Sequence, residues 1–198
     1  MSQKPTLSTK IDRMRSGTRI LGNQLARANT HLHFFRGLLL RYGELSKAQD
    51  FWDYTLAAHS GMTIRDLGVI CDTHKLGINL INLLAQVDTP LLDSASHQKL
   101  LRFRGVAGKP STNPRVTMLR EWRNNIVAHY NDVVAANDRD DFWNQNPLGE
   151  VALQTLIDTG FEIVEWCGKM ASVSSEFPRF ANGKNGHFAV LDSLKALT

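Results

Sequence analysis

Apolar residues recur at alternating spacings of three and four along the first part of the chain. An α-helix has about 3.6 residues per turn, so this spacing places them on one face of a helix. The residues on this face are Leu21, Leu25, Ala28, Leu32, Phe35, Leu39 and Tyr42. The pattern therefore predicts a long amphipathic helix with one side against a core.

A second apolar stripe follows a shorter amphipathic stretch at residues 50–60. Its members are Leu67, Cys71, His74, Ile78, Ile81 and Ala85. Thr63 is a residue type that caps helix N-termini, and the sequence Asp-Thr-Pro at 88–90 is typical of a helix end. We therefore expect a second long helix over residues 63–86, in which His74 is structural.

The remaining segments predict more helices and no strand-type alternation. Residues 93–105 indicate a short helix closed by Gly105, residues 114–136 a helix beginning at Pro114, and residues 149–171 a last long helix. The expected fold is an all-α, up-and-down bundle of about four long helices plus short ones. We expect a basic N-terminal segment over residues 1–17, one helical domain over residues 18–172 and a loop-like tail over residues 173–198.

Composition narrows the class of protein. A chain of 198 residues can bury one sizeable core, and it contains no apolar run of the roughly 18 residues that cross a bilayer. The N-terminal residues lack the apolar region of a secretory signal, so we expect a cytoplasmic protein without a membrane partner. Cys71 and Cys167 lie in apolar helical patterns without a CxxC spacing, which indicates buried thiols.

Positive charge is concentrated in two stretches. Residues 1–41 hold eight Lys and Arg against one acid, and residues 99–123 hold seven against Glu121, although the net charge of the whole chain is only +4. Basic stretches of this kind attract phosphate backbones, and they also serve simply to keep a protein soluble. The charge pattern is compatible with nucleic-acid binding but does not establish it.

The sequence EWRNNIVAHYND at residues 121–132 carries the candidate chemistry. In a regular helix, Arg123 and His129 lie about 60° to either side of Ile126 and about 9 Å apart along the axis. Asn125 is one turn before His129 and can orient its imidazole. One phosphate reaches both Arg123 and His129 only through the long Arg side chain, a distorted helix or a groove shared with a second subunit.

Arg123, Asn124 and His129 together resemble the R-x(4–6)-H signature of the HEPN superfamily, in which a polar residue commonly follows the Arg. The order of segments is similar to the abortive-infection type U branch, including FWDYTLAAHSGMTIRDLGVICD before the second long helix. The likeness covers most of residues 18–171. It implies a helical bundle with endoribonuclease activity that needs no metal and no cofactor.

The resemblance also implies roles for individual residues. His129 would act as the acid or base on a ribose hydroxyl, because an imidazole titrates near pH ~6.5. Arg123 would bind the scissile phosphate, and Asn124 would position the substrate or the imidazole. Asn125, Tyr130 and Arg120 are the residues expected to bind or orient the substrate. The alternative to a catalytic site is that His129 is a hydrogen-bonded structural histidine and that the helix has a polar edge without a chemical role.

The partners implied by the resemblance are RNA and a second copy of the chain in a homodimer, and an antitoxin or another defence-system protein is a further class that it allows. In HEPN toxins regulated by a partner nucleotidyltransferase, a Tyr lies two residues after the His. Here Tyr130 follows His129 directly and position 131 is Asn, so this mode of regulation is not expected. The alternative function is a non-catalytic helical module that binds RNA or a protein through the same basic surface.

Overall fold

The computed structural model describes residues 6–41, 43, 49–107, 113–124, 148–173 and 177. Over these residues the chain is an all-α helical bundle without a strand, which confirms the expected fold class. The elements are α1 (Leu7–Leu40), α2 (Gln49–Ile70), α3 (Leu80–Leu84), the 3₁₀ helix η2 (Thr89–Leu91), α4 (Ser94–Val106), α5 (Pro114–Trp122) and α8 (Glu150–Met170).

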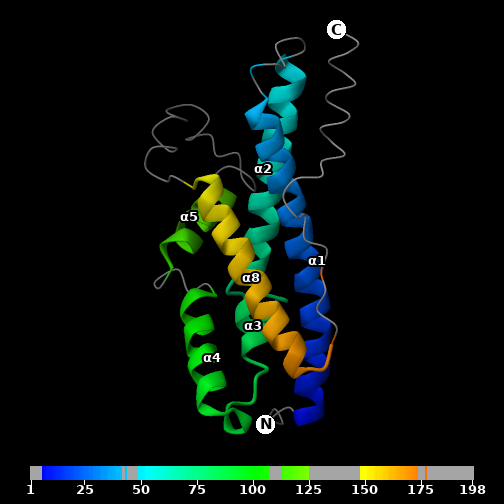
Figure 1. Ribbon diagram of the computed structural model, residues 1–198, viewed down its shortest axis with the longest axis vertical. Helices are drawn as coiled ribbons and strands as arrows, with labels where there is room; N and C mark the ends of the chain where they lie inside the picture. Colours follow the sequence, from blue (N-terminus) through cyan, green and yellow to red (C-terminus); the bar gives the residue numbers. More distant parts are fainter. Residues whose placement is uncertain are drawn as a thin grey trace.

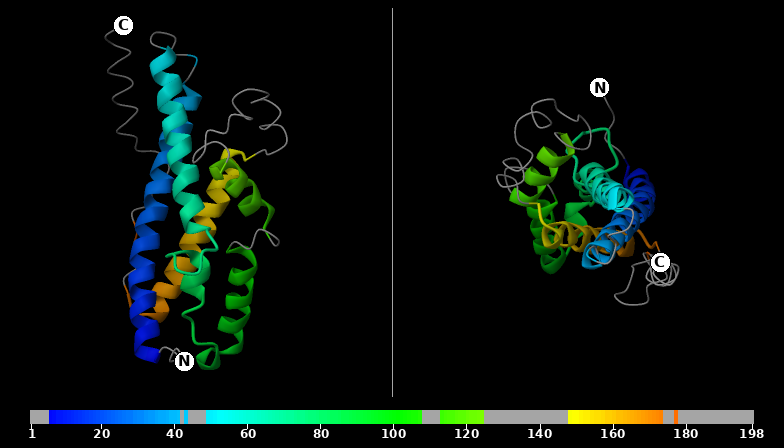
Figure 2. Two further views of the ribbon diagram at one scale, coloured as in Figure 1. Left: turned by 180° about the vertical axis from the view of Figure 1, so that it is seen from behind. Right: turned by 90° about the horizontal axis from the view of Figure 1, so that it is seen from above.

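The two longest helices, α1 and α2, form an antiparallel hairpin that is the axis of the molecule (Figure 1). The views from behind and from above show α1 and α2 side by side and α8 slanting across α1 (Figure 2). The short helix α3 packs against α1, α4 and α8, and α5 packs against α2. The end of α2 therefore lies where α5 can reach it.

The core lies between the hairpin and α8. Leu21, Leu25 and Leu32 of α1 and Ile157 and Ile163 of α8 are at most 1% exposed. Burying each such side chain contributes roughly 1.5–3 kcal/mol to folding. The apolar stripe predicted for α1 is thus confirmed in its central part, as is the helix predicted for residues 149–171.

Several helices begin with the polar caps that their sequences supply. The side chain of Thr6 accepts a hydrogen bond from the amide of Thr9 at the start of α1, and Asp93 accepts one from Ser96 at the start of α4. This hydrogen bond from the Ser96 amide lowers the pKa of the Asp93 carboxyl. At α5, Asn113 caps a helix that opens with Pro114, as predicted.

The beginning of the chain differs from the sequence-based boundaries. α1 starts at Leu7, inside the segment 1–17 that was expected to precede the domain. Met14 and Gly17 are buried within the helix, so this part of the segment contributes to the core. Two described residues, Val173 and Phe177, fall in the predicted tail over residues 173–198.

The prediction of a second long helix over residues 63–86 is wrong. The helix α2 instead joins the shorter stretch before it, runs from Gln49 to Ile70 and then ends, and α3 begins only at Leu80. Thr63, expected as an N-cap, is buried inside α2 and donates a hydrogen bond from its hydroxyl to the carbonyl of His59. His74 and Ile78, expected on a buried stripe, are exposed.

Side-chain amides explain the break between α2 and α3. The side chain of Asn79 donates to the carbonyl of His74 at 2.9 Å and accepts from the backbone amide of Asn82 at 2.8 Å, so it caps α3. The side-chain amide of Asn82 donates to the carbonyl of Gly77 at 2.6 Å. These bonds give the backbone an alternative to helical pairing, which is why Asn favours caps and turns. Residues 71–79 form a loop for this reason.

A layer of polar residues connects α1 to α2 inside the hairpin. The guanidinium of Arg27 donates to both carboxylate oxygens of Asp66, at 2.5 Å and 2.9 Å, and the Asp66 side chain is only 2% exposed. One turn further along α1, the Nδ1 atoms of His31 and His59 are 2.9 Å apart, and the ring of Phe34 stacks on His59. A proton shared by the two imidazoles and a two-pronged ion pair therefore fix how the helices align.

None of the described helices combines the length and the apolar character needed to cross a membrane. Cys71 and Cys167 are buried and free, as predicted, and burial raises the pKa of each thiol to about 12. Thiols of this kind stay protonated and unreactive near neutral pH. The two cysteines are therefore part of the packing.

We predict that Arg27→Gln lowers the free energy of unfolding by about 1.5–3 kcal/mol, because it removes both short bonds to the buried carboxylate of Asp66 and leaves only the longer contact with Arg65. The matched control is Arg65→Gln, since Arg65 contacts the same carboxylate through one longer bond of 3.4 Å. The control should cost less than about 1 kcal/mol, as half-exposed ion pairs usually do. Urea unfolding at neutral pH measures both, and equal losses would contradict a special role for Arg27.

Acid should weaken the hairpin through His31. Burial lowers the pKa of His31, and the charges of Arg27 and Arg65 lower it further, against an opposing effect of Asp66. The unfolded chain then binds more protons than the folded one below pH ~6.5, so stability is complete above that pH and falls as the pH drops toward the lower folded pKa. Unfolding titrations between pH 8 and pH 5 should show a shallower loss for His31→Gln than for the parent protein. Parallel curves would contradict this assignment.

Candidate functional site

The candidate site begins where α5 ends against α2. Val116, Leu119 and Trp122 of α5 are at most 3% exposed, so three successive turns of this short helix are anchored in the core. Trp122, the last residue of α5, is the largest of these anchors. The anchored helix delivers the next residue, Arg123, to the surface of α2.

Arg123 and Asn124 form a π-helical turn directly after Trp122. Such turns widen a helix locally and are often found at functional positions. The geometry of a regular helix, used above to relate Arg123 to His129, therefore does not hold at Arg123 and Asn124.

The guanidinium of Arg123 is held from three sides. Its Nη1 donates to the carbonyl of Gly68 at 3.1 Å and lies 3.5 Å from the carboxylate of Asp72, and its Nε donates to the side-chain oxygen of Asn124 at 3.2 Å. The Arg123 side chain is 22% exposed. Within the described residues, Nη2 has no hydrogen-bond partner, so one prong of the fork is available to an anion.

Gly68 makes this placement possible. A Cβ built on Gly68 would lie 2.5 Å from Cδ of Arg123 and 3.2 Å from its Cγ, distances at which atoms overlap. The aliphatic part of the Arg123 side chain therefore lies directly on the backbone of α2. This close approach also brings Nη1 within reach of a helix carbonyl, which a larger residue at position 68 would screen.

Asp72 is oriented for its contact with Arg123 by the loop after α2. Its second carboxylate oxygen accepts a hydrogen bond from the amide of Thr73 at 2.7 Å, and its side chain is 35% exposed. The carboxylate balances the charge of Arg123 and fixes one face of the guanidinium. An incoming phosphate would share the Arg with this acid.

The other predicted site residues divide into two groups. Arg120 is half-buried one turn before Arg123, and Asn124 is exposed and contacts Arg123. Asn125, His129 and Tyr130 lie outside the described residues, as does the predicted helix beyond residue 124. The structure thus brings together Arg123 and Asn124, and the pairing of Arg123 with His129 stays a prediction.

The sequence missed the partners of Arg123 and the polar layer of the hairpin. Gly68 and Asp72 were placed inside a continuous helix, where neither stood out. A signal for the polar layer was present in α2, because His59, Thr63 and Asp66 recur at spacings of four and three and so share one helix face. The spacing identifies a polar stripe but not its partner helix.

Much of the positive charge in the two basic stretches is balanced within the protein. The described ion pairs are Lys10 with Asp88, Arg15 with Asp12, Arg27 and Arg65 with Asp66, Arg36 with Glu150, Lys99 and Arg102 with Glu162, and Arg123 with Asp72. Over the described ranges, the basic residues of these stretches without a hydrogen bond or ion pair are Arg13, Arg19, Arg104, Arg115 and Arg120. The surface available to a phosphate backbone is therefore smaller than the sequence suggests.

No cluster of three or more His, Cys, Asp or Glu residues suited to a metal ion occurs in the part of the chain that the structure describes. Arg123, Asn124 and Asp72 offer a cation, an amide and a carboxylate at one place. This set can bind and orient an anionic group, and it needs a proton-transfer residue from elsewhere to do acid-base chemistry.

Searches of protein-family models, curated proteins and solved structures found no match to this chain.

We predict that Gly68→Ala destabilises the protein by about 1–3 kcal/mol, because the added methyl group must displace the Arg123 side chain. Gly61→Ala is the matched control on the same helix, since a Cβ there meets nothing within 4 Å. That control should stabilise α2 by roughly 0.5–1 kcal/mol, the usual advantage of Ala over Gly in a helix.

The cause can be tested with a second substitution. In the double variant Gly68→Ala with Arg123→Ala, the clash is absent. The stability loss of the double variant should therefore be smaller than the sum of the losses of the two single variants, by at least about 0.5 kcal/mol. Thermal and urea unfolding of the four proteins gives this coupling. Strict additivity would show that Gly68 and Arg123 do not contact each other.

Proposed function

We propose that this protein is a metal-independent endoribonuclease of the HEPN kind, acting in the cytoplasm in phage defence or as a toxin, and that Arg123 and His129 cleave the RNA. The observation that supports this most is the state of Arg123. It is the first residue of the Arg-Asn-x4-His pattern, and its guanidinium is fixed on α2 with Nη2 directed to no described partner.

The reaction proposed is an attack of a ribose 2′-hydroxyl on the adjacent phosphorus. The new P–O2′ bond forms as the P–O5′ bond breaks, which leaves a 2′,3′-cyclic phosphate and a 5′-hydroxyl. One proton leaves the 2′-oxygen and one reaches the 5′-oxygen, and His129 is the group that exchanges protons near neutral pH. Nη2 of Arg123 stabilises the charge that develops on the phosphoryl oxygens.

Asp72 and Gly68 have positioning roles in this proposal. A long Arg side chain loses much rotamer freedom when it binds a ligand, and that cost is reduced if the side chain is already held. The carbonyl of Gly68 and the carboxylate of Asp72 hold Nη1, so Nη2 is already oriented when the substrate binds. Asn124, bonded to Nε, completes the fixed fork.

A homodimer and an RNA substrate belong to the same proposal. Two copies of the segment 123–129 facing one groove would let Arg123 of one copy act with His129 of the other. The π-helical turn at residues 123 and 124 is a second route to the same end within one chain. An antitoxin or defence-system protein would then regulate access to this groove.

A second candidate function is a non-catalytic helical module that binds RNA or a protein partner. One observation favours it, namely that the ion pair with Asp72 gives Arg123 a purely structural task as a clamp between α5 and α2. Ion pairs of about half of the described basic residues also limit the free cationic surface. The two functions differ in whether RNA is cut.

We predict that the purified protein cleaves single-stranded RNA in EDTA. Arg123→Lys keeps the charge but loses the fork, and His129→Asn keeps a hydrogen bond but cannot exchange protons. Each should lower the rate by about 10² or more, the usual scale for lost acid-base or charge-stabilising groups. The matched controls Arg115→Lys and His97→Asn, away from the motif, should cleave at the parental rate.

Unfolding curves recorded on the same samples distinguish the two functions. Folded Arg123→Lys and His129→Asn proteins with little activity support the nuclease. If these variants instead melt early while their folded fractions cleave at the parental rate, the residues are structural. Absence of cleavage by the parent, together with RNA binding in a gel-shift assay, would establish the non-catalytic module.

A further inference from the structure

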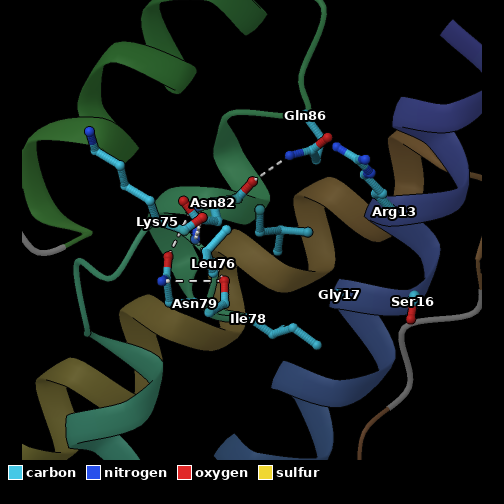
Figure 3. Close-up of a pocket in the computed structure, with 11 residues that line it drawn as sticks. Arg13, Ser16, Gly17, Lys75, Leu76, Ile78, Asn79, Asn82 and Gln86 are labelled. Atoms are coloured by element: carbon cyan, nitrogen blue, oxygen red, sulfur yellow. Dashed lines mark hydrogen bonds between the residues drawn. The ribbon is translucent and has the colours of Figure 1, made fainter. Parts of the chain in front are cut away.

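A cavity of about 450 Å³ lies between the N-terminal half of α1, the loop that joins α2 to α3, and α3 itself (Figure 3). Arg13 and Gly17 of α1, the loop residues 75–79, and Leu83 and Gln86 line it. Its volume is in the range of small-molecule binding sites, about 300–1,000 Å³. It shares no residue with the Arg123 site.

The walls of the cavity are fixed before any ligand arrives. Asn79 is 1% exposed, and its side-chain amide donates to the carbonyl of His74. The side-chain amide of Asn82 donates to the carbonyl of Gly77, and Figure 3 marks the hydrogen bonds among the lining residues with dashed lines. Gln86 donates to the carbonyl of Asn82 at 3.0 Å. On the α1 side, Gly17 approaches so closely that a Cβ there would be 3.0 Å from Leu83. Part of the ordering that often opposes ligand binding is therefore already present in the backbone of the loop.

The charge of the lining selects an anion. Two of the lining residues are basic, Arg13 and Lys75, and none is acidic. In Figure 3 the Arg13 side chain extends from α1 toward Gln86, whereas the Lys75 side chain points away from α1. Arg13 has no ion pair within the described ranges, unlike Lys10 one turn earlier, which binds Asp88. Arg13 is thus the cation that a bound anion would meet.

The same cavity also presents apolar side chains that the fold leaves in water. Leu76 is 91% exposed and Ile78 is 46% exposed, and both belong to the lining. Figure 3 shows Ile78 extending toward Gly17 across the cavity. A ligand with an apolar body would cover these side chains, and burying their apolar surface would stabilise the complex. The lining therefore combines an anion-binding fork with an apolar surface.

We propose that this cavity binds a small organic anion whose carboxylate or phosphate group pairs with Arg13 and whose apolar body covers Leu76 and Ile78. A guanidinium donates two parallel hydrogen bonds to either kind of head group. Binding would tie α1 to the loop after α2. The site is independent of RNA cleavage, so it stands or fails separately from the proposed function.

The test is a set of titrations of the ¹⁵N-labelled full chain followed by NMR. 3-Phenylpropionate and phenyl phosphate are the organic anions, inorganic phosphate is the head group alone, and 3-phenylpropanamide is the uncharged body. Shifts should centre on the backbone amides of Gly17, Gly77 and Ile78. Whichever organic anion binds more tightly identifies the preferred head group. Inorganic phosphate and 3-phenylpropanamide should each bind at least tenfold more weakly than that anion.

Variants separate this site from general charge attraction. Arg13→Gln should weaken binding of the preferred anion tenfold or more, and Leu76→Ser should weaken it about threefold or more. Circular dichroism checks that each variant is folded. Arg19→Gln is the matched control, because Arg19 is likewise an exposed α1 cation without a described ion pair but does not line the cavity. Equal losses for Arg13→Gln and Arg19→Gln, equal binding of the amide, or no localised shift at millimolar ligand would overturn the proposal.

Discussion

The ion pair between Arg27 and Asp66 sets the arrangement on which the rest of the structure depends. A carboxylate that is 2% exposed would be strongly destabilising if it lacked a charged partner, and the two bonds from Arg27 provide one. The two bonds from Arg27 to Asp66 favour one register between α1 and α2. Gly68 lies on α2, Asp72 lies in the loop directly after it, and both contact Arg123, so the register of the hairpin also places the candidate site.

The sequence predicted the parts of the fold that depend on local patterns. The last long helix, the central stripe of α1 and the start of α5 at Pro114 follow from apolar spacing and from residues that cap helices. The helix expected across residues 63–86 failed because the amides of Asn79 and Asn82 bind loop carbonyls. Apolar spacing does not register this competition, and the loop was therefore assigned to a helix.

The candidate site was predictable only in part, for a different reason. Arg123 and Asn124 could be selected from their spacing in the motif, and the structure brings them into contact. The contacts of Arg123 with Gly68 and Asp72 join residues more than 50 positions apart in the chain. No local pattern carries that information. The value of a Gly at position 68 becomes apparent only when the Arg side chain lies across it.

The contacts of Arg123 are compatible with both a structural role and the proposed binding of a phosphate. Nη1 ties the end of α5 to Gly68 of α2 and to Asp72 in the loop after α2, Nε contacts the neighbouring Asn124, and Nη2 faces no described residue. A side chain that only held α5 against α2 would not need a guanidinium nitrogen without a hydrogen-bond partner, whereas a side chain that binds phosphate requires one. Charge compensation by Asp72 keeps the guanidinium stable while the prong is empty, which links the stability of the hairpin to the proposed chemistry.

The most direct test of the proposed chemistry is the chemical structure of the RNA ends after incubation with the protein in EDTA, determined by mass spectrometry. Attack by the 2′-hydroxyl predicts fragments with 2′,3′-cyclic phosphate and 5′-hydroxyl ends. Fragments with 3′-hydroxyl and 5′-phosphate ends would mean that water attacks in place of the ribose. Such ends, or the appearance of cleavage only after a divalent metal is added, would contradict the account.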